Sequence, residues 1–122
     1  MIEIQTNASN GLIEATVTGQ LRADDFGSVA PQVDKFIEQH DKVSVLLDLT
    51  GFHGWEDVAA ARTHFRFIKD HHKRIERIAV VANKTWQHWI AAVIGTFISA
   101  KEKCFDENQK DEARNWLTSV TA

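Results

Sequence analysis

Two short and almost wholly apolar segments, residues 43–49 and 78–82, constrain the fold of this chain more than any other feature. Each segment is too short for a buried helix, and each ends at a polar or glycine-rich turn that carries a tryptophan. A strand that is covered on both faces of a parallel sheet reads as a continuous apolar run of this kind. The two segments therefore predict central strands, each followed by a surface loop and a helix.

The periodicity of the remaining segments predicts the rest of an α/β fold. The full set is strands at 2–6, 12–19, 43–49, 77–82 and 103–105, and helices at 24–40, 55–72, 84–98 and 108–119. Asn10-Gly11 suits the hairpin turn, and Pro31 is expected to kink the first helix or to start a second segment. The order ββαβαβαβα requires right-handed crossovers and a mixed, mostly parallel sheet of about five strands with four helices. A single domain over residues 1–122 is expected.

The composition argues against several kinds of partner. The 17 acidic and 14 basic side chains give a net charge of -3 and are scattered, whereas nucleic-acid binding requires a concentrated basic face. Cys104 is the one cysteine, which excludes an internal disulfide and fits a reducing compartment such as the cytoplasm. The N-terminus has no secretory-signal pattern, and the apolar helix at 84–98 is shorter than the roughly 20 residues that span a bilayer. We expect a cytoplasmic protein without nucleic-acid binding or integral membrane association.

Motifs spread over most of the chain match those of a known family. They are Phe52-His53-Gly54-Trp55, Arg77-Ile78-Ala79-Val80-Val81 leading to Trp86, Phe105-Asp106, and Glu112-Ala113 ahead of Trp116-Leu117. In these motifs the chain resembles small stand-alone bacterial proteins of the SpoIIAA-like superfamily, which is related to STAS domains and more distantly to the CRAL-TRIO lipid-transfer domain. The resemblance implies a right-handed superhelix of strands and helices, and it implies little about function.

One departure from STAS domains bears on regulation. A STAS domain that is switched by phosphorylation carries Asp-Ser-Ser-Gly at the start of the helix after the central strand. Asp57 matches the aspartate here, but Val58 and Ala59 stand at the serine positions and offer no hydroxyl group. The comparison therefore implies no phosphorylation site at this helix start.

The region after the central strand is the best candidate for a ligand site, because open parallel sheets bind ligands beyond the carboxyl ends of their strands. Residues 51–55 are expected to form a loop there, and Trp86 follows the next strand at the equivalent end. The candidate ligand-binding residues are Phe52, His53, Trp55, Trp86 and Trp89. This aromatic set favours a small apolar or lipid-like ligand. In the alternative interpretation, Trp55 and Trp86 only close the ends of the core.

The helix at 84–98 is apolar over more than half of its circumference, which is wider than a surface helix needs to meet its own core. The extra apolar surface of this helix is expected to be buried in a homodimer. The alternatives are an apolar ligand, a membrane surface or burial by the last helix. The candidate interface residues are Trp89, Ile90, Val93, Ile94, Phe97 and Phe67. The chain thus predicts a binding module, with a protein-interaction or signalling module as the alternative.

Enzyme and metal chemistry find little support in the sequence. His64, His71 and His72 are spaced seven and eight residues apart, so they are interpreted as solvated or edge histidines and no metal site is expected. Cys104 is interpreted as a packed residue, since no base lies near it in the sequence. Asp48 and Asp57 are weak candidates for acid and base roles. No catalytic residue and no cofactor are predicted.

The helix at 55–72 carries a basic stripe on one side. Arg62, Arg66, Lys69 and Lys73 follow helical spacing and are interpreted as a solvated face. The opposite side, expected to face the core, consists of Val58, Ala61, Phe65 and Ile68.

Overall fold

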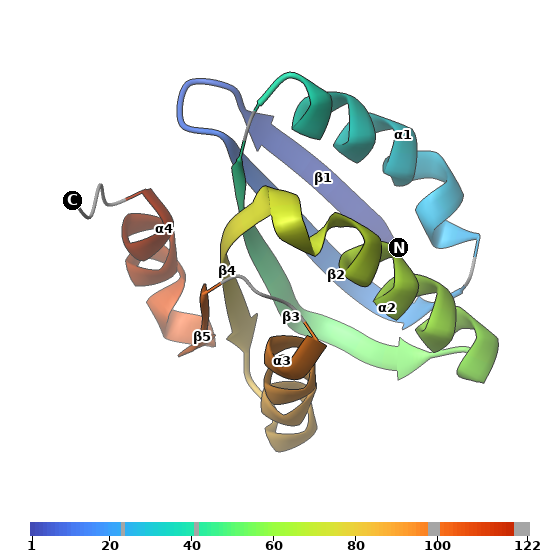
Figure 1. Cartoon of the computed structure of the whole chain (residues 1–122). Coiled ribbons are helices and arrows are strands. Elements are labelled where there is room, and N and C mark those ends of the chain that lie inside the picture. Colours follow the sequence, from blue (N-terminus) through green and yellow to red (C-terminus); the bar gives the residue numbers. More distant parts are fainter. Residues whose placement is uncertain (23, 41, 98–100, 119–122) are drawn as a thin grey trace.

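Five strands and four α-helices alternate along residues 1–22, 24–40, 42–97 and 101–118, which the computed structural model describes (Figure 1). The strands are β1 (Ile2–Asn7), β2 (Leu12–Leu21), β3 (Val43–Trp55), β4 (Ile75–Ala82) and β5 (Lys101–Asp106). The helices are α1 (Asp25–Glu38), α2 (Val58–His71), α3 (Thr85–Phe97) and α4 (Lys110–Thr118), with 3-10 turns η1 (His72–Arg74) and η2 (Glu107–Gln109). This order confirms the predicted arrangement. The predicted helix ends at Ile98 and Ser119 lie outside the described residues.

The strands form one sheet in the order β1-β2-β3-β4-β5, so their order in space is their order in the chain. β1 is antiparallel to β2, and the three other neighbouring pairs are parallel. Gly11 has a φ of 62° in the turn between β1 and β2, a conformation that glycine adopts without a steric penalty. The mixed, mostly parallel sheet is therefore as predicted.

β3 is longer than the apolar run that predicted it. The segment expected to be a loop, 51–55, continues the strand and pairs with an extended β2, with Thr18 opposite Gly51 and Leu21 opposite Trp55. The loop prediction is therefore wrong. A Cβ at Gly51 would lie 3.1 Å from the Thr18 side chain, which is a tight contact, and Gly54 has a φ of 108°, which favours glycine. The two glycines serve an irregular strand pair rather than a surface turn.

The helices divide between the two faces of the sheet, and each face has its own apolar core. α1, α2 and α3 pack on one face, whose core includes Val33 of α1 and Ile90 of α3. α4 packs on the other face, where Leu46 of β3 and Leu117 of α4 belong to the same core (Figure 1). Because successive side chains of a strand point to opposite faces, each central strand contributes to both cores. α1 runs as one helix through Pro31, so no second segment begins there.

The buried side of α2 differs from the predicted one. Val58 is exposed, whereas Ala60 and His64 are buried; Ala61 and Phe65 are partly buried. The prediction that His64 is a solvated or edge histidine is therefore wrong. The prediction failed because the contact of His64 with the Trp55 indole, which buries this polar side chain, is not visible in the spacing of apolar residues along the helix. The side chains of Ile68, His71 and His72 lie outside the described ones.

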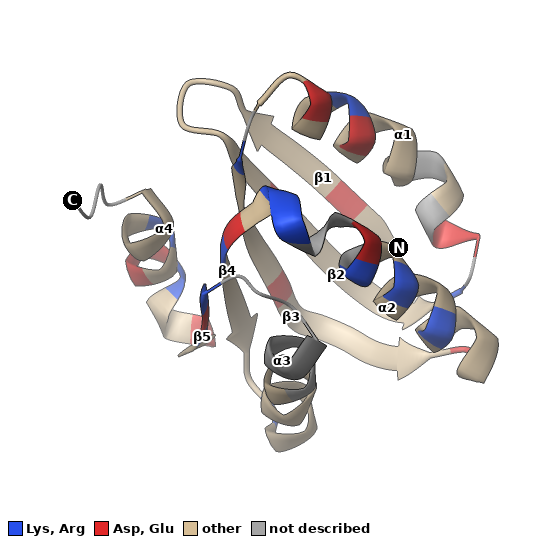
Figure 2. Ribbon diagram, in the orientation of Figure 1, with Lys and Arg blue, Asp and Glu red and all other residues tan. Residues whose placement is uncertain are grey.

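The basic stripe on α2 is exposed, as predicted. Figure 2 shows lysine and arginine positions (blue) recurring along this helix. They are Arg62, Arg66, Lys69 and, in η1, Lys73. Within the described ranges, no helix combines the length and the apolar character needed to cross a bilayer.

Candidate functional site

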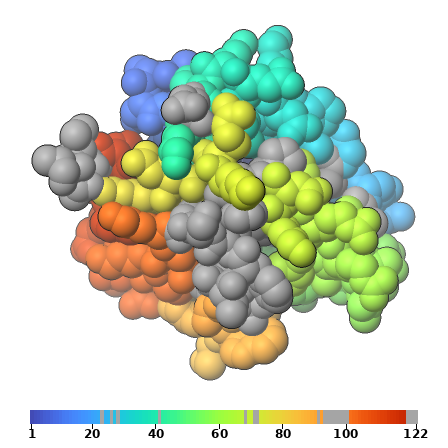
Figure 3. Space-filling view, viewed as in Figure 1, coloured from blue at the N-terminus to red at the C-terminus, as the bar shows by residue number. Residues whose placement is uncertain are grey.

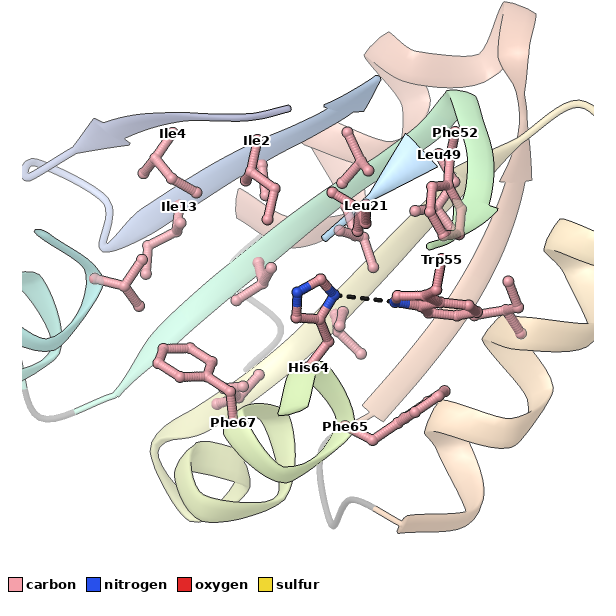
Figure 4. A pocket seen from close by; sticks show the side chains of 18 of the residues that line it. Ile2, Ile4, Ile13, Leu21, Leu49, Phe52, Trp55, His64, Phe65 and Phe67 are labelled. Atoms are coloured by element: carbon pink, nitrogen blue, oxygen red, sulfur yellow. Dashed lines mark hydrogen bonds between the residues drawn. The ribbon is translucent and has the colours of Figure 1, made fainter. Parts of the chain in front are cut away.

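An apolar cavity of about 130 Å³ lies between the sheet and the helices of its three-helix face (Figure 4). All the strands from β1 to β4 contribute side chains to it, and so do α1, α2 and α3. Ile4, Ile13 and Leu49 line it from the sheet, and Ile37 and Phe65 line it from the helices. Its wall is assembled from segments far apart in the sequence, which is why no local motif marks it.

The centre of the sheet is incompletely covered at this cavity. Val45 and Leu47 belong to β3, which has strands on both sides, yet both side chains line the cavity and are only partly buried. Leu46 lies between them, points to the opposite face under α4, and is 1% exposed. Because Leu46 is fully covered and Val45 and Leu47 are not, the incompletely covered face of the sheet is the one under α1 and α2. Strand alternation puts Val45 and Leu47 on this face together.

Two polar side chains occur among the described lining residues, and they bond to one another. The indole Nε1 of Trp55, at the end of β3, donates a hydrogen bond to Nδ1 of His64 on α2 over 3.0 Å (Figure 4). An indole N–H can only donate, so Nδ1 is the acceptor and the neutral imidazole carries its proton on Nε2. The bond fixes both the tautomer and the orientation of the ring.

The same surroundings keep the imidazole neutral. Burial lowers the pKa of His64 below its ordinary value of 6.5, against the opposing effects of the Arg22 backbone and the Asp25 carboxylate. A charged imidazole would lose solvation in this apolar wall, and protonated Nδ1 would no longer accept the indole hydrogen. His64 is therefore a neutral part of the cavity wall.

Aromatic side chains continue from the cavity towards the surface. The Phe52 ring lies edge-on to Trp55, with ring centroids 4.9 Å apart, and its centroid is 5.4 Å from that of Trp86. On the other side, the Trp55 and Phe65 centroids are 5.6 Å apart. Trp86 thus contacts Phe52, which lines the cavity, but Trp86 does not line the cavity itself.

The structure separates the five candidate ligand-binding residues. Phe52 and Trp55 line the cavity, and Trp86 packs on Phe52 and is 38% exposed. His53 is exposed, and Trp89 is 69% exposed. His53 and Trp89 are outside the cavity wall, so the aromatic residues do not form one rim.

The candidate interface residues are also divided. Ile90 is buried and lines the cavity, and Phe67 is partly buried and lines it as well, which removes both from a surface made by α3. Trp89 is exposed. The side chains of Val93, Ile94 and Phe97 lie outside the described ones.

The two aspartates considered for acid and base roles have structural partners away from the cavity. Asp48 Oδ2 accepts a hydrogen bond from Nζ of Lys110 on α4 over 2.9 Å, and Asp48 Oδ1 accepts from the hydroxyl and the backbone N–H of Thr50. Burial would raise the pKa of Asp48, but the Thr50 and Lys110 contacts outweigh it and the pKa is lowered. Asp57 Oδ1 accepts from the backbone N–H of Ala60 and so stabilises the start of α2.

Sequence reasoning missed several cavity residues, His64 above all. The available signal was Trp55, because a buried indole N–H usually requires an acceptor on a packed element, and α2 follows directly. Val45 and Leu47 were recognised only as core residues of a strand. In the part of the chain that the structure describes, no group of three or more histidine, cysteine, aspartate or glutamate side chains is arranged to hold a metal ion.

The described elements define a small α/β domain built on one mixed sheet. The chain belongs to the SpoIIAA-like family, whose sequence profile matches residues 12–118. Among solved structures it is similar to an uncharacterised protein of the DUF3478 family with a SpoIIAA-like fold, from Shewanella loihica PV-4. The two share 22% sequence identity with a TM-score of 0.80, over 96% of this chain and 92% of that one. This likeness confirms the predicted fold. Among curated proteins, none matches this chain.

Proposed function

We propose that this protein binds a small apolar molecule in the cavity between the sheet and helices α1, α2 and α3. The observation that carries the proposal is the partial exposure of Val45 and Leu47 at the centre of the sheet. Removing apolar surface from water is worth about 25 cal/mol per Å², so a ligand that covers these two side chains gains binding free energy from them.

The wall of the cavity supports a neutral apolar ligand. The indole N–H of Trp55 and Nδ1 of His64 are bonded to one another, so recognition rests on shape and apolar contact. A cavity of about 130 Å³ is close to the roughly 150 Å³ of apolar cavities that hold benzene. We therefore favour one ring or a short hydrocarbon chain as the buried part of the ligand.

The cavity shares one lining residue, Phe67, with a groove on the surface. A shallow groove between α1 and α2 is lined by Gly27 and Ala30 of α1, by Thr63, Arg66, Phe67 and Asp70 of α2, and by Asp24 just before α1. Phe67 also lines the cavity, so its side chain stands between the groove and the interior. In the space-filling view, α1 (light blue to teal) and α2 (yellow-green) lie beside one another on this face (Figure 3). A longer lipid-like chain would leave the cavity here.

Protein interaction through α3 is the second candidate function. The exposed Trp89 and the partly exposed Trp86 are three residues apart and so share one side of α3. Exposed tryptophans three residues apart are typical of an interface. Light scattering of wild type and Trp89→Glu tests the homodimer form, which requires wild type to be a dimer and the variant a monomer.

The first test of ligand binding is native mass spectrometry of the protein purified from its own host, followed by organic extraction of the bound material. Val45→Phe fills the cavity and should abolish retention of the extracted compound. Val58→Phe makes the same change at an exposed position and should retain it. Equal retention by the two variants would contradict the proposal.

A second measurement serves if Val45→Phe does not fold. Benzene is titrated into wild-type protein with methyl-labelled isoleucine and valine, and the methyl resonances are followed by NMR. We expect saturable shifts at Ile13 and Val45, which line the cavity, and none at Val58. Uniform, non-saturating shifts at all methyl groups would argue against a binding site.

A further inference from the structure

A cysteine, a histidine and an aspartate meet between α3 and β5, away from the apolar cavity. Alternation along β5 places Glu102, Cys104 and Asp106 on the side of the strand that faces α3, while Phe105 belongs to the opposite core. α3 brings His88 against them. Cys104 has no base near it in the sequence, and this base is 16 residues away in the chain.

His88 contacts both neighbours through its two ring nitrogens. Nδ1 lies 2.8 Å from Sγ of Cys104, and Nε2 lies 3.7 Å from Oδ1 of Asp106. A nucleophile within hydrogen-bond reach of a base, with a third group that orients and stabilises the charged base, is the signature of an activated nucleophile. We propose that Cys104, His88 and Asp106 form a nucleophilic thiol site that takes small, soft carbon electrophiles such as α,β-unsaturated carbonyl compounds.

The site is open to reagents of this size. The side chains of His88 and Asp106 are 40% and 69% exposed, and Cys104 is partly buried. Burial, together with the carboxylates of Glu102 and Asp106, raises the pKa of the Cys104 thiol. The sulfur therefore holds its proton at neutral pH, and its reactivity depends on the base beside it.

The reaction needs no other reactant. As the S–H proton of Cys104 passes to Nδ1 of His88, the sulfur electron pair forms a C–S bond to the β carbon of the alkene. The alkene π pair moves to the α carbon, which takes the proton back from His88. Asp106 stabilises the imidazolium while it exists. The product is a thioether, and His88 ends neutral.

The rate of alkylation by N-ethylmaleimide tests this assignment. Cys104 is the one cysteine of the chain, so the gain in intact-protein mass reports on it alone. Near pH 7 we expect His88→Gln to react at least about tenfold more slowly than wild type, because the general base is lost. The matched control, His53→Gln, changes an exposed histidine on β3 and should react at the wild-type rate.

The pH profile separates a base from a merely structural neighbour. The wild-type rate should rise at a lower pH than ionisation of the thiol alone would allow, whereas the His88→Gln rate should rise only as the thiol itself ionises. The titratable groups that face the sulfur are the carboxylates of Glu102 and Asp106 on β5 and the imidazole of His88 on α3.

Asp106→Asn should fall between wild type and His88→Gln. If His88→Gln does not fold, the wild-type profile and Asp106→Asn decide the question. An unchanged or faster rate in His88→Gln, or a wild-type rate that rises only as the thiol itself ionises, would overturn the proposal.

Discussion

Trp55 and His64 are joined by a hydrogen bond from the indole Nε1 to imidazole Nδ1, 3.0 Å long, and this bond links the end of β3 to α2. Both side chains line the apolar cavity. The bond therefore does two things: it satisfies a donor and an acceptor in an apolar wall, and it holds α2 at a set position over the sheet.

Trp55→Phe should lower the free energy of unfolding by about 1–3 kcal/mol, because the acceptor on His64 loses its indole donor in a partly buried site. The control is Trp89→Phe, the same change at a side chain that is 69% exposed, which should change the stability by less than about 0.5 kcal/mol. Urea denaturation of the three proteins measures both effects. Equal losses in the two variants would show that the bond contributes nothing of its own.

The free energy of unfolding should decrease as the pH is lowered, because of His64. Burial lowers its pKa in the folded protein below the ordinary 6.5, so the unfolded chain binds the proton more tightly. The contribution of His64 is therefore complete above pH 6.5 and is lost as the pH falls through the lowered pKa. His64→Gln keeps an acceptor for Trp55 but does not titrate. Between about pH 7.5 and about pH 5, wild type should lose more free energy of unfolding than this variant, and parallel losses would refute the assignment.

Asp48→Asn should destabilise the face covered by α4. The charge-assisted bond to Lys110, 2.9 Å long, is weakened, at a cost of about 1–3 kcal/mol at neutral pH. Because the pKa of Asp48 is lowered despite burial, this stability is present above the ordinary carboxyl pKa and is lost as the pH falls through the lowered one. The difference between wild type and variant should therefore shrink in acid. Asp111→Asn, at a largely exposed carboxylate, is the control and should be close to neutral.

Gln87→Met should loosen the docking of α3. Gln87 is fully buried; its Nε2 donates to the Phe52 carbonyl over 3.1 Å, and its Oε1 accepts from the Asn83 N–H over 2.9 Å. Methionine fills a similar volume but removes the donor to the buried Phe52 carbonyl, which costs about 1–3 kcal/mol, whereas the N–H of the exposed Asn83 can turn to water. Gln32→Met, at an exposed position of α1, should have little effect. Amide hydrogen exchange in α3 should also accelerate in Gln87→Met alone.

The order of the strands and helices was predictable because the sequence signals for them are local. Apolar runs marked the central strands, and Asn10-Gly11 marked the hairpin. The extension of β3 was not predictable in the same way. Gly51 and Gly54 have the composition of a turn, and only the approach of Thr18 from another strand gives them a role inside a sheet. A tertiary contact here outweighs a local preference.

The cavity and the thiol site were less predictable, since both depend on which faces meet. Phe52 and Trp55 were among the candidate ligand-binding residues, but His64, which bonds to Trp55, was interpreted as a solvated or edge histidine. His88 and Cys104 lie on elements whose mutual position depends on strand order and on where α3 begins. Neither quantity can be obtained from residue spacing within a single element.

Consecutive residues of α3 tie that helix to two distant parts of the molecule. Gln87 donates a hydrogen bond to the backbone carbonyl of Phe52 at the cavity, and His88 contacts the sulfur of Cys104 at the sheet edge. One turn of helix moves as a rigid piece, so a displacement that frees the imidazole also shifts the amide anchor. The helix therefore connects the cavity wall to the edge of the sheet through two adjacent side chains.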